Sequence, residues 1–219
     1  MEEKILKLCD KGHLNIGIMG GTFNPIHYGH LVTAEEALKQ FKLDKVVFIP
    51  TGKPPHKTSG ILASAEDRYL MTVIATASNK DFFVSRVEID RKGKSYTIDT
   101  LRKLKEIFKD RATLYFITGA DAILEILSWK DTHEIFNLCR FIAATRPGYD
   151  IAKIEDFKKK LFEKIKQLKK TEHHVFLMEI PALAISSTDI RNRIKTCRPI
   201  NYLLPEGVCN YLLKHELYK

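Results

Sequence analysis

The sequence predicts an α/β fold: a doubly wound, mostly parallel, Rossmann-like sheet with helices on both faces and a small C-terminal helical cap. Short, nearly continuous apolar runs alternate with amphipathic stretches, and neither an internal repeat nor a low-complexity linker interrupts them. Parallel strands are buried on both faces and need helical crossovers, so this alternation is typical of them. We expect residues 15–219 to form a single domain after an N-terminal extension, residues 1–14.

Six apolar runs are the expected strands, at residues 15–19, 45–50, 82–89, 113–118, 140–145 and 175–180. Seven amphipathic stretches are the expected helices, at residues 30–41, 65–77, 97–108, 121–127, 153–170, 187–196 and 205–218. Apolar residues recur in them at helical spacing. The last two stretches form the expected cap.

The composition excludes two classes of protein. The 219 residues carry a formal charge of +9 and are 44% hydrophobic, which is too apolar for a disordered chain, and no apolar run is long enough to cross a membrane. Eight lysines against three acidic residues lie in the segment 153–170. A nucleic-acid or membrane-surface role could use this charge, but the solvated face of a helix explains the same residues, so we expect neither partner.

The N-terminus and the cysteines point to a cytoplasmic protein. Acidic and basic residues precede the first apolar ones, unlike in a secretory signal peptide. The cysteines are scattered and form no C-x-x-C pair, which argues against a zinc site and a disulfide framework. We expect free thiols at Cys9, Cys139, Cys197 and Cys209.

The first strand runs directly into the segment GGTFNPIHYGHL, residues 20–31. Gly20 and Gly21 allow a sharp turn and a close approach of phosphate to the backbone, and Pro25 stiffens the loop. The segment matches neither the P-loop nor the G-x-G-x-x-G pattern. Because it lies at the expected carboxyl end of a strand and opens a helix, it predicts an anion-binding loop of another design.

Two histidines stand at the start of that helix. His27 and His30 are three residues apart, so both rings can lean toward one point above the helix N-terminus. They could also be a helix cap and a core residue, or two ligands of a zinc ion. No Cys, Asp or Glu supplies a third ligand at suitable spacing, so we expect no metal held by protein side chains.

The H-x-G-H segment resembles the signature of a nucleotidyltransferase superfamily, and later segments resemble its bacterial nicotinate-nucleotide adenylyltransferase branch. That family commonly has Asp where this chain has Asn24, whose short amide can make the same turn contact. The resemblance covers nearly the whole chain beyond residue 14. The later segments are KPPHK (53–57), RKGKSYTIDTL (91–101), GADAILEILSWK (119–130), TRPG (145–148), ISSTDIRNRI (185–194) and NYLLPEGVCNYLLKHELY (201–218).

The resemblance implies adenylyl transfer from ATP to nicotinate mononucleotide, with release of pyrophosphate. It implies that His30 stabilises the α-phosphate in the transition state and that His27 holds the phosphates beside it. The implied ATP-binding set is Gly20, Gly21, Thr22, Phe23, His27, His30, Ser187, Thr188 and Arg191. We expect Mg²⁺ to bind through ATP phosphates and water.

For nicotinate mononucleotide, the resemblance implies that Trp129 stacks on the pyridine ring and that backbone N–H groups near Thr97 hold the carboxylate. The other implied residues are Lys53, His56, Lys57, Gly119, Asp121 and Arg146. Each has a plain alternative: a tryptophan can pack in the core, loop cations can be merely solvated, and Asp121 can cap a helix.

Two rival functions are weighed against this one. A phosphopantetheine adenylyltransferase shares the phosphate chemistry but is usually shorter and lacks the KPPHK and Trp segments. A basic nucleic-acid-binding module would account for the lysines, but it leaves the H-x-G-H loop unexplained. The sequence leaves room for a homo-oligomer.

Overall fold

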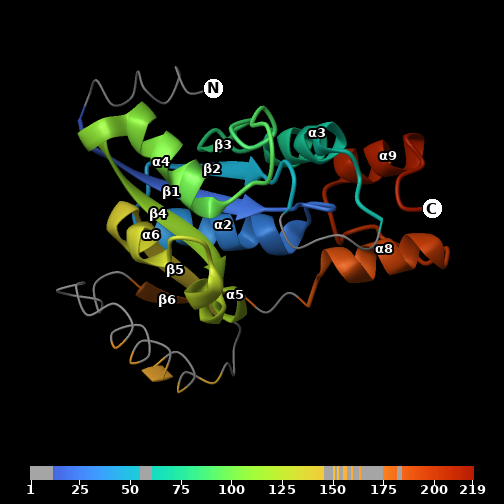
Figure 1. Ribbon diagram of the computed structural model, residues 1–219. Coiled ribbons are helices and arrows are strands. Elements are labelled where there is room, and N and C mark those ends of the chain that lie inside the picture. The colour runs from blue at the N-terminus through green and yellow to red at the C-terminus, as the bar shows by residue number, and fades with distance from the viewer. Residues whose placement is uncertain are drawn as a thin grey trace.

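The computed structural model (Figure 1) describes residues 12–54, 61–145, 150, 152, 155–156, 159, 163, 175–181 and 184–219. Its centre is a six-stranded sheet in the order β3-β2-β1-β4-β5-β6, and every pairing is parallel. The strands are β1 (Leu14–Gly21), β2 (Lys45–Pro50), β3 (Phe82–Val84), β4 (Ala112–Gly119), β5 (Arg140–Thr145) and β6 (Val175–Glu179). This confirms the predicted α/β class and the parallel sheet.

The helices that connect and flank the strands are α2 (Tyr28–Gln40), α3 (Ala65–Thr76), α4 (Thr97–Phe108), α5 (Ala120–Leu124), α6 (Thr132–Leu138), α8 (Ser187–Lys195) and α9 (Glu206–Lys214). Two short 3₁₀ turns occupy Lys109–Arg111 and Ile126–Ser128. Serine caps begin two of the helices: Ser64 Oγ accepts from the Asp67 amide at 3.0 Å, and Ser186 Oγ accepts from the Asp189 amide at 3.1 Å.

Two apolar layers cover the two faces of the sheet. Alternate residues of a strand enter opposite layers: Leu114 and Phe116 of β4 pack with α4, α5 and α6, whereas Tyr115 and Ile117 pack with α2, α3, α8 and α9. The predicted C-terminal cap is present as α8 and α9, which Figure 1 shows beyond the ends of β1 and β2, with α9 beside α3. Among the described residues, no helix is long and apolar enough to span a membrane.

The expected elements differ from the structure in several places. The helix expected at 121–127 is divided into α5 and the 3₁₀ turn Ile126–Ser128, and the helix expected at 205–218 ends at Lys214. The strand expected at 82–89 ends at Val84. The next residue, Ser85, still donates its amide to the Phe48 carbonyl of β2 at 2.8 Å, and the chain then turns. Helix α6 was not expected; it is short and begins after Asp131, whose φ is 52°. Strand β1 begins at Leu14, one residue before the expected domain boundary.

Part of the prediction lies outside the described residues. Residues 1–11 are among these, and so is most of the expected helix 153–170, of which the described positions 155, 156, 159 and 163 are helical. Within the described part of the chain, the cysteines are free: Cys139 and Cys209 are buried, and Cys197 is exposed.

Candidate active site

Two cavities meet at the carboxyl ends of β1 and β4. The strand order reverses between these two neighbouring strands: β2 and β3 lie next to β1 on one side, and β5 and β6 lie next to β4 on the other. Ligands of open α/β sheets bind at such a reversal. Gly20 and Thr118 line both cavities, so a molecule in one cavity can meet a molecule in the other at this point.

The first cavity, called the histidine cavity here, measures about 450 Å³. It lies over the N-terminus of α2 and continues past the end of β4 to the start of α8. Polar and apolar residues both line it. Its lining includes Gly20, His27, Gly29, His30, Thr33, Gly119, Asp121, Ser186 and Ser187.

The geometry of the histidine pair sets the proton position on His30. The two ring centroids are 3.8 Å apart, and the His27 backbone N–H donates to His30 Nδ1 at 3.3 Å. A backbone amide can only donate, so Nδ1 accepts and the proton of a neutral ring lies on Nε2. Burial and the neighbouring His27 hold the pKa of His30 well below its ordinary value of 6.5. His30 is therefore an uncharged N–H donor at neutral pH.

The Phe23 ring packs against the histidine pair. Its backbone has a φ of 48°, and its buried ring lies edge-on to the His30 ring, with centroids 5.1 Å apart. A Cβ at Gly21 would come within 3.0 Å of the Phe23 ring, so the close approach requires glycine there. The Phe23 side chain thus packs under the loop and sets the position of His30.

Donors from distant segments hold the carbonyl groups of the first loop. Arg68, which is 1% exposed, donates to the Thr22 carbonyl at 2.8 Å. Arg191 donates to the Asn24 carbonyl and Ser187 to the Pro25 carbonyl, each at 2.8 Å. The ISSTDIR segment therefore braces the loop through two of the side chains expected to face an anion.

The side chain of Asn24 links the loop to two further segments, residues 61–63 and the C-terminal Tyr218. Its Oδ1 accepts from the Ala63 amide at 3.1 Å and from the Tyr218 hydroxyl at 2.6 Å, and its Nδ2 donates to the Ile61 carbonyl at 2.9 Å. An aspartate could accept the first two bonds, but its second oxygen would face the Ile61 carbonyl. The amide thus suits these contacts in this chain.

The second cavity, called the aromatic cavity here, measures about 490 Å³. Its walls come from the ends of β1, β2 and β4, the start of α4 and the segment after α5. The Trp129 ring packs edge-on against Phe116, with centroids 6.0 Å apart, and Lys130 Nζ lies 4.9 Å from the centre of the Tyr96 ring. The lining also includes Gly21, Thr22, Thr51, Pro54, Glu88, Ser95, Thr97, Thr100 and Thr118.

A buried carboxyl group lies in the wall of the aromatic cavity. Glu88 is 7% exposed, and its Oε1 accepts from the Thr100 hydroxyl at 2.7 Å. Burial raises the pKa of Glu88, while hydrogen bonds from Thr100 and Ser95 and the charges of Arg91 and Arg68 act in the opposite direction. Nothing in the sequence pattern had singled this residue out.

The structure divides the predicted site residues between the cavities. Gly20, His27, His30, Ser187, Gly119 and Asp121 line the histidine cavity, and Gly20, Gly21, Thr22, Thr97 and Trp129 line the aromatic cavity. Phe23, Thr188 and Arg191 support the loop, and Lys53 is exposed beside Ser95. The predicted residues His56, Lys57 and Arg146 lie outside the described residues.

Four side chains of the site went unnoticed in the sequence: Arg68, Glu88, Tyr96 and Lys130. Lys130 directly follows Trp129, and Tyr96 directly precedes Thr97, so adjacency to residues already chosen could have found both. Arg68 and Glu88 carry no local signal, because their contacts reach loops that are distant in sequence.

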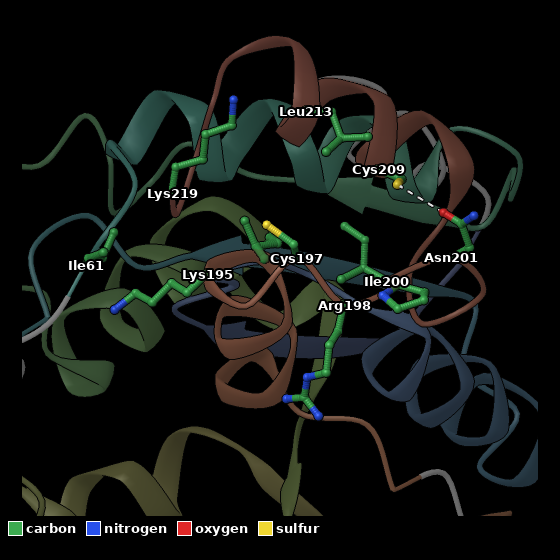
Figure 2. Close-up of a pocket in the computed structure, with 11 residues that line it drawn as sticks. Ile61, Lys195, Cys197, Arg198, Ile200, Asn201, Cys209, Leu213 and Lys219 are labelled. Carbon is green, nitrogen blue, oxygen red and sulfur yellow. Dashed lines mark hydrogen bonds between the residues drawn. The ribbon is translucent and has the colours of Figure 1, made fainter.

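A cavity larger than these two, about 840 Å³, lies elsewhere, between α8 and α9 (Figure 2). Aliphatic side chains form much of its wall. Figure 2 shows the charged ends of Lys195, Arg198 and Lys219 pointing in different directions rather than toward one point. Its size does not make it the candidate site, because it lacks the convergent polar groups and the strand ends of the other two cavities.

No group of three or more His, Cys, Asp or Glu side chains that could hold a metal ion occurs within the described ranges. The histidine cavity offers the Asp121 carboxyl group and hydroxyl groups instead. These are oxygen groups, which suit a hard cation that keeps its water and binds mainly to a ligand's phosphates.

The comparisons with known proteins agree with this geometry. The family model described as cytidylyltransferase-like matches residues 18–193. The "Probable nicotinate-nucleotide adenylyltransferase" of Thermoanaerobacter sp. is 52% identical, over 94% of this chain and 95% of its own, and that of Moorella thermoacetica is 54% identical, over 93% and 91%.

Among solved structures, the fold is similar to Plasmodium falciparum nicotinic acid mononucleotide adenylyltransferase complexed with NaAD. The TM-score is 0.74 at 23% sequence identity, with 94% of this chain and 98% of that chain covered. At this identity the likeness concerns the fold alone.

Proposed function

The chain belongs to the nicotinate-nucleotide adenylyltransferase family, and we propose that it transfers the adenylyl group of ATP to nicotinate mononucleotide, forming nicotinate adenine dinucleotide and pyrophosphate. The observation that carries this proposal is the meeting of two cavities at Gly20, next to the histidine pair. A dinucleotide needs two neighbouring sites whose phosphates come together. The substrates are soluble metabolites, so we propose a cytoplasmic enzyme.

The chemistry needs little acid–base catalysis. The attacking phosphate monoester has a second pKa of about 6, so it is already mostly ionised at neutral pH. The enzyme must bring two mutually repelling polyanions into line and stabilise the charge that develops on the α-phosphate and the leaving pyrophosphate.

The histidine cavity supplies this stabilisation in the proposal. ATP lies with its α-phosphate above the N-terminus of α2, where the helix dipole favours negative charge. His30 donates its Nε2–H to the α-phosphate, and His27 lies beside it as a second imidazole. Because His27 N–H fixes His30 Nδ1, the ring is oriented before the substrate arrives.

Mg²⁺ is proposed to bind through ATP phosphates and water, where it neutralises phosphate charge. The protein contributes oxygen groups in the histidine cavity, among them the carboxyl group of Asp121. Backbone groups of the first loop and of the start of α2 would orient the phosphates.

The aromatic cavity is proposed to take the pyridine mononucleotide. Trp129 and Tyr96 offer ring surfaces, and the N-terminus of α4 at Thr97 offers backbone N–H groups for the carboxylate. Lys130 adds a positive charge within the same cavity. An amide would set its own N–H₂ against these donors, so the site favours the acid.

Incubation with ATP, Mg²⁺ and each pyridine mononucleotide, with pyrophosphate release measured, tests the function. We expect kcat/KM to be at least roughly a hundredfold higher for nicotinate mononucleotide than for its amide. The amide sets a donor against the donors of the cavity and also loses a charge-assisted hydrogen bond, and the two free-energy costs add. Release with pantetheine phosphate but with neither pyridine substrate would contradict the assignment.

A further inference from the structure

We propose that Glu88 is a positioning residue for the mononucleotide: its buried carboxylate joins the two loops that form one wall of the aromatic cavity. The inference rests on the proposed function, because the mononucleotide is the ligand assigned to that cavity. One loop follows β2 and contains Thr51 and Pro54, and the other contains Ser95 and leads into α4, which begins at Thr97.

The first set of contacts fixes the loop after β2. The Ser95 hydroxyl acts on the Glu88 carboxylate, whose pKa it lowers, and accepts from the Lys53 amide at 3.3 Å, while the Ser95 amide donates to the Lys53 carbonyl at 2.9 Å. Gly52 packs directly on the Glu88 backbone: a Cβ at Gly52 would lie 2.2 Å from the Glu88 carbonyl oxygen. This loop therefore follows the position of Glu88.

The second set fixes the start of α4. Thr100, in the first turns of the helix, donates to Glu88 Oε1 at 2.7 Å and accepts from Arg91 at 3.0 Å. Thr100 is 2% exposed, so this bond is shielded from water. The backbone N–H groups near Thr97, which are proposed to hold the substrate's carboxylate, are three residues from this anchor.

A carboxylate suits this position better than an amide of the same shape. The Thr100 hydroxyl donates to Glu88 Oε1, so this position needs an acceptor. A glutamine would lose the negative charge that faces Arg91 and Arg68, and its N–H₂ could take the place of the acceptor. The charge is balanced by Arg91 and by buried Arg68, which also donates to the Gly52 carbonyl at 3.1 Å.

The test is Glu88→Gln, compared with wild type by two measurements. In pyrophosphate release, we expect KM for nicotinate mononucleotide to rise about fivefold to tenfold, while KM for ATP and kcat stay within about twofold. Trp129 is the single tryptophan of the chain, so its fluorescence reports binding in the aromatic cavity without turnover. The mononucleotide Kd from this titration should rise by the same factor.

Two further variants sharpen the test. In a Thr100→Val background, Glu88→Gln should raise the mononucleotide KM less than it does alone, because the hydroxyl that donates to Glu88 is already gone. Glu134→Gln is the matched control: Glu134 pairs with Arg102 on the outer side of α4 and α6, outside the cavity, so both KM values should stay unchanged.

Three outcomes would overturn the proposal: an unchanged mononucleotide KM and Kd in Glu88→Gln, a parallel rise of both KM values with a fall in Tm, or full additivity with Thr100→Val. Failure of the proposed function is separate. If wild type binds the mononucleotide but releases no pyrophosphate, the function is wrong and the Kd comparison still decides the role of Glu88. If wild type does not bind it, both proposals are wrong.

Discussion

The histidine cavity and the aromatic cavity share two residues but are built differently. The catalytic part of the histidine cavity comes from one continuous segment, the end of β1 and the start of α2. The aromatic cavity is assembled from five separate segments between Ile18 and Ile135. Holding a phosphate needs backbone and a helix start, which neighbouring residues can provide, whereas enclosing a flat ring needs walls from several directions.

The proposed function also gives the two cavities different kinds of binding. In the histidine cavity, an uncharged donor and a helix terminus would act on charge that develops during the reaction. In the aromatic cavity, ring surfaces and a lysine would act on features that the substrate has before and after the reaction. Substitutions in the first cavity should therefore lower kcat, and those in the second should raise KM.

The largest expected effect is that of His30→Ala. Removal of a donor to the developing charge should lower kcat by about 10² to 10³, with KM for the mononucleotide nearly unchanged. His30→Asn is the matched control, because its amide oxygen can still accept from the His27 N–H while the Nε2 donor is lost; it should lose as much activity with a smaller fall in Tm. Wild-type kcat in either variant would remove His30 from catalysis.

Next in size is Trp129→Ala. Loss of stacking on the pyridine ring, worth about 1 to 3 kcal/mol for aromatic bases, should raise KM for both pyridine mononucleotides by at least about fivefold. KM for ATP should stay constant, and Trp129→Phe should recover part of the loss. If the mononucleotide KM stayed the same, Trp129 would be a packing partner of Phe116 only.

A smaller and more selective effect is expected for Lys130→Met. The lysine side chain lies over the Tyr96 ring within the cavity. Its loss should lower kcat/KM for nicotinate mononucleotide by about fivefold and leave the amide form unaffected, because only the acid carries the matching charge. Lys103→Met, on the exposed face of α4, serves as the control. Equal losses for acid and amide would rule out charge recognition.

The smallest expected effect is on stability. The pKa of folded His30 is lowered, whereas the unfolded chain takes up this proton at about pH 6.5. Below that pH the unfolded state binds a proton that the folded state does not, so wild type loses stability as the pH falls from about 6.5 toward the lowered pKa.

His30→Asn lacks this dependence, so the difference in Tm between wild type and variant should move by about 2 to 4 °C in the variant's favour between pH 7.5 and 5.5, measured calorimetrically. Carboxyl groups with lowered pKa values, such as Asp81 and Glu134, contribute equally to both proteins. A constant difference across this range would mean that His30 takes up its proton equally well in both states.

The contrast between the cavities also explains what could be predicted from the sequence. His27, His30 and the glycines before them are neighbours in the chain, so their spacing alone brings them together. Glu88 and Arg68 were missed because each acts through bonds to loops that only the fold brings near. Arg191 and Ser187 were chosen through the resemblance, but their contacts with the first loop, which span more than 160 residues, could not be predicted from spacing.

For the fold, the long buried strands were the most predictable part, because β1, β2, β4 and β5 each have partners on both sides and read as apolar runs. The edge strand β3 was predicted too long, since only one neighbour fixes its end. Helix α6 was missed because seven residues hold too few apolar positions to show a helical period.

The bond between Tyr218 and Asn24 has a consequence for biosynthesis. The two residues are 194 positions apart, and the hydroxyl of Tyr218 completes the contacts of the first loop. When the ribosome has made β1 and the H-x-G-H segment, the loop still lacks the partners that hold it, Arg68 first, then Ser187 and Arg191, and finally Tyr218. A nascent chain can therefore begin its sheet early, but it assembles a complete phosphate site only after those later residues have left the exit tunnel.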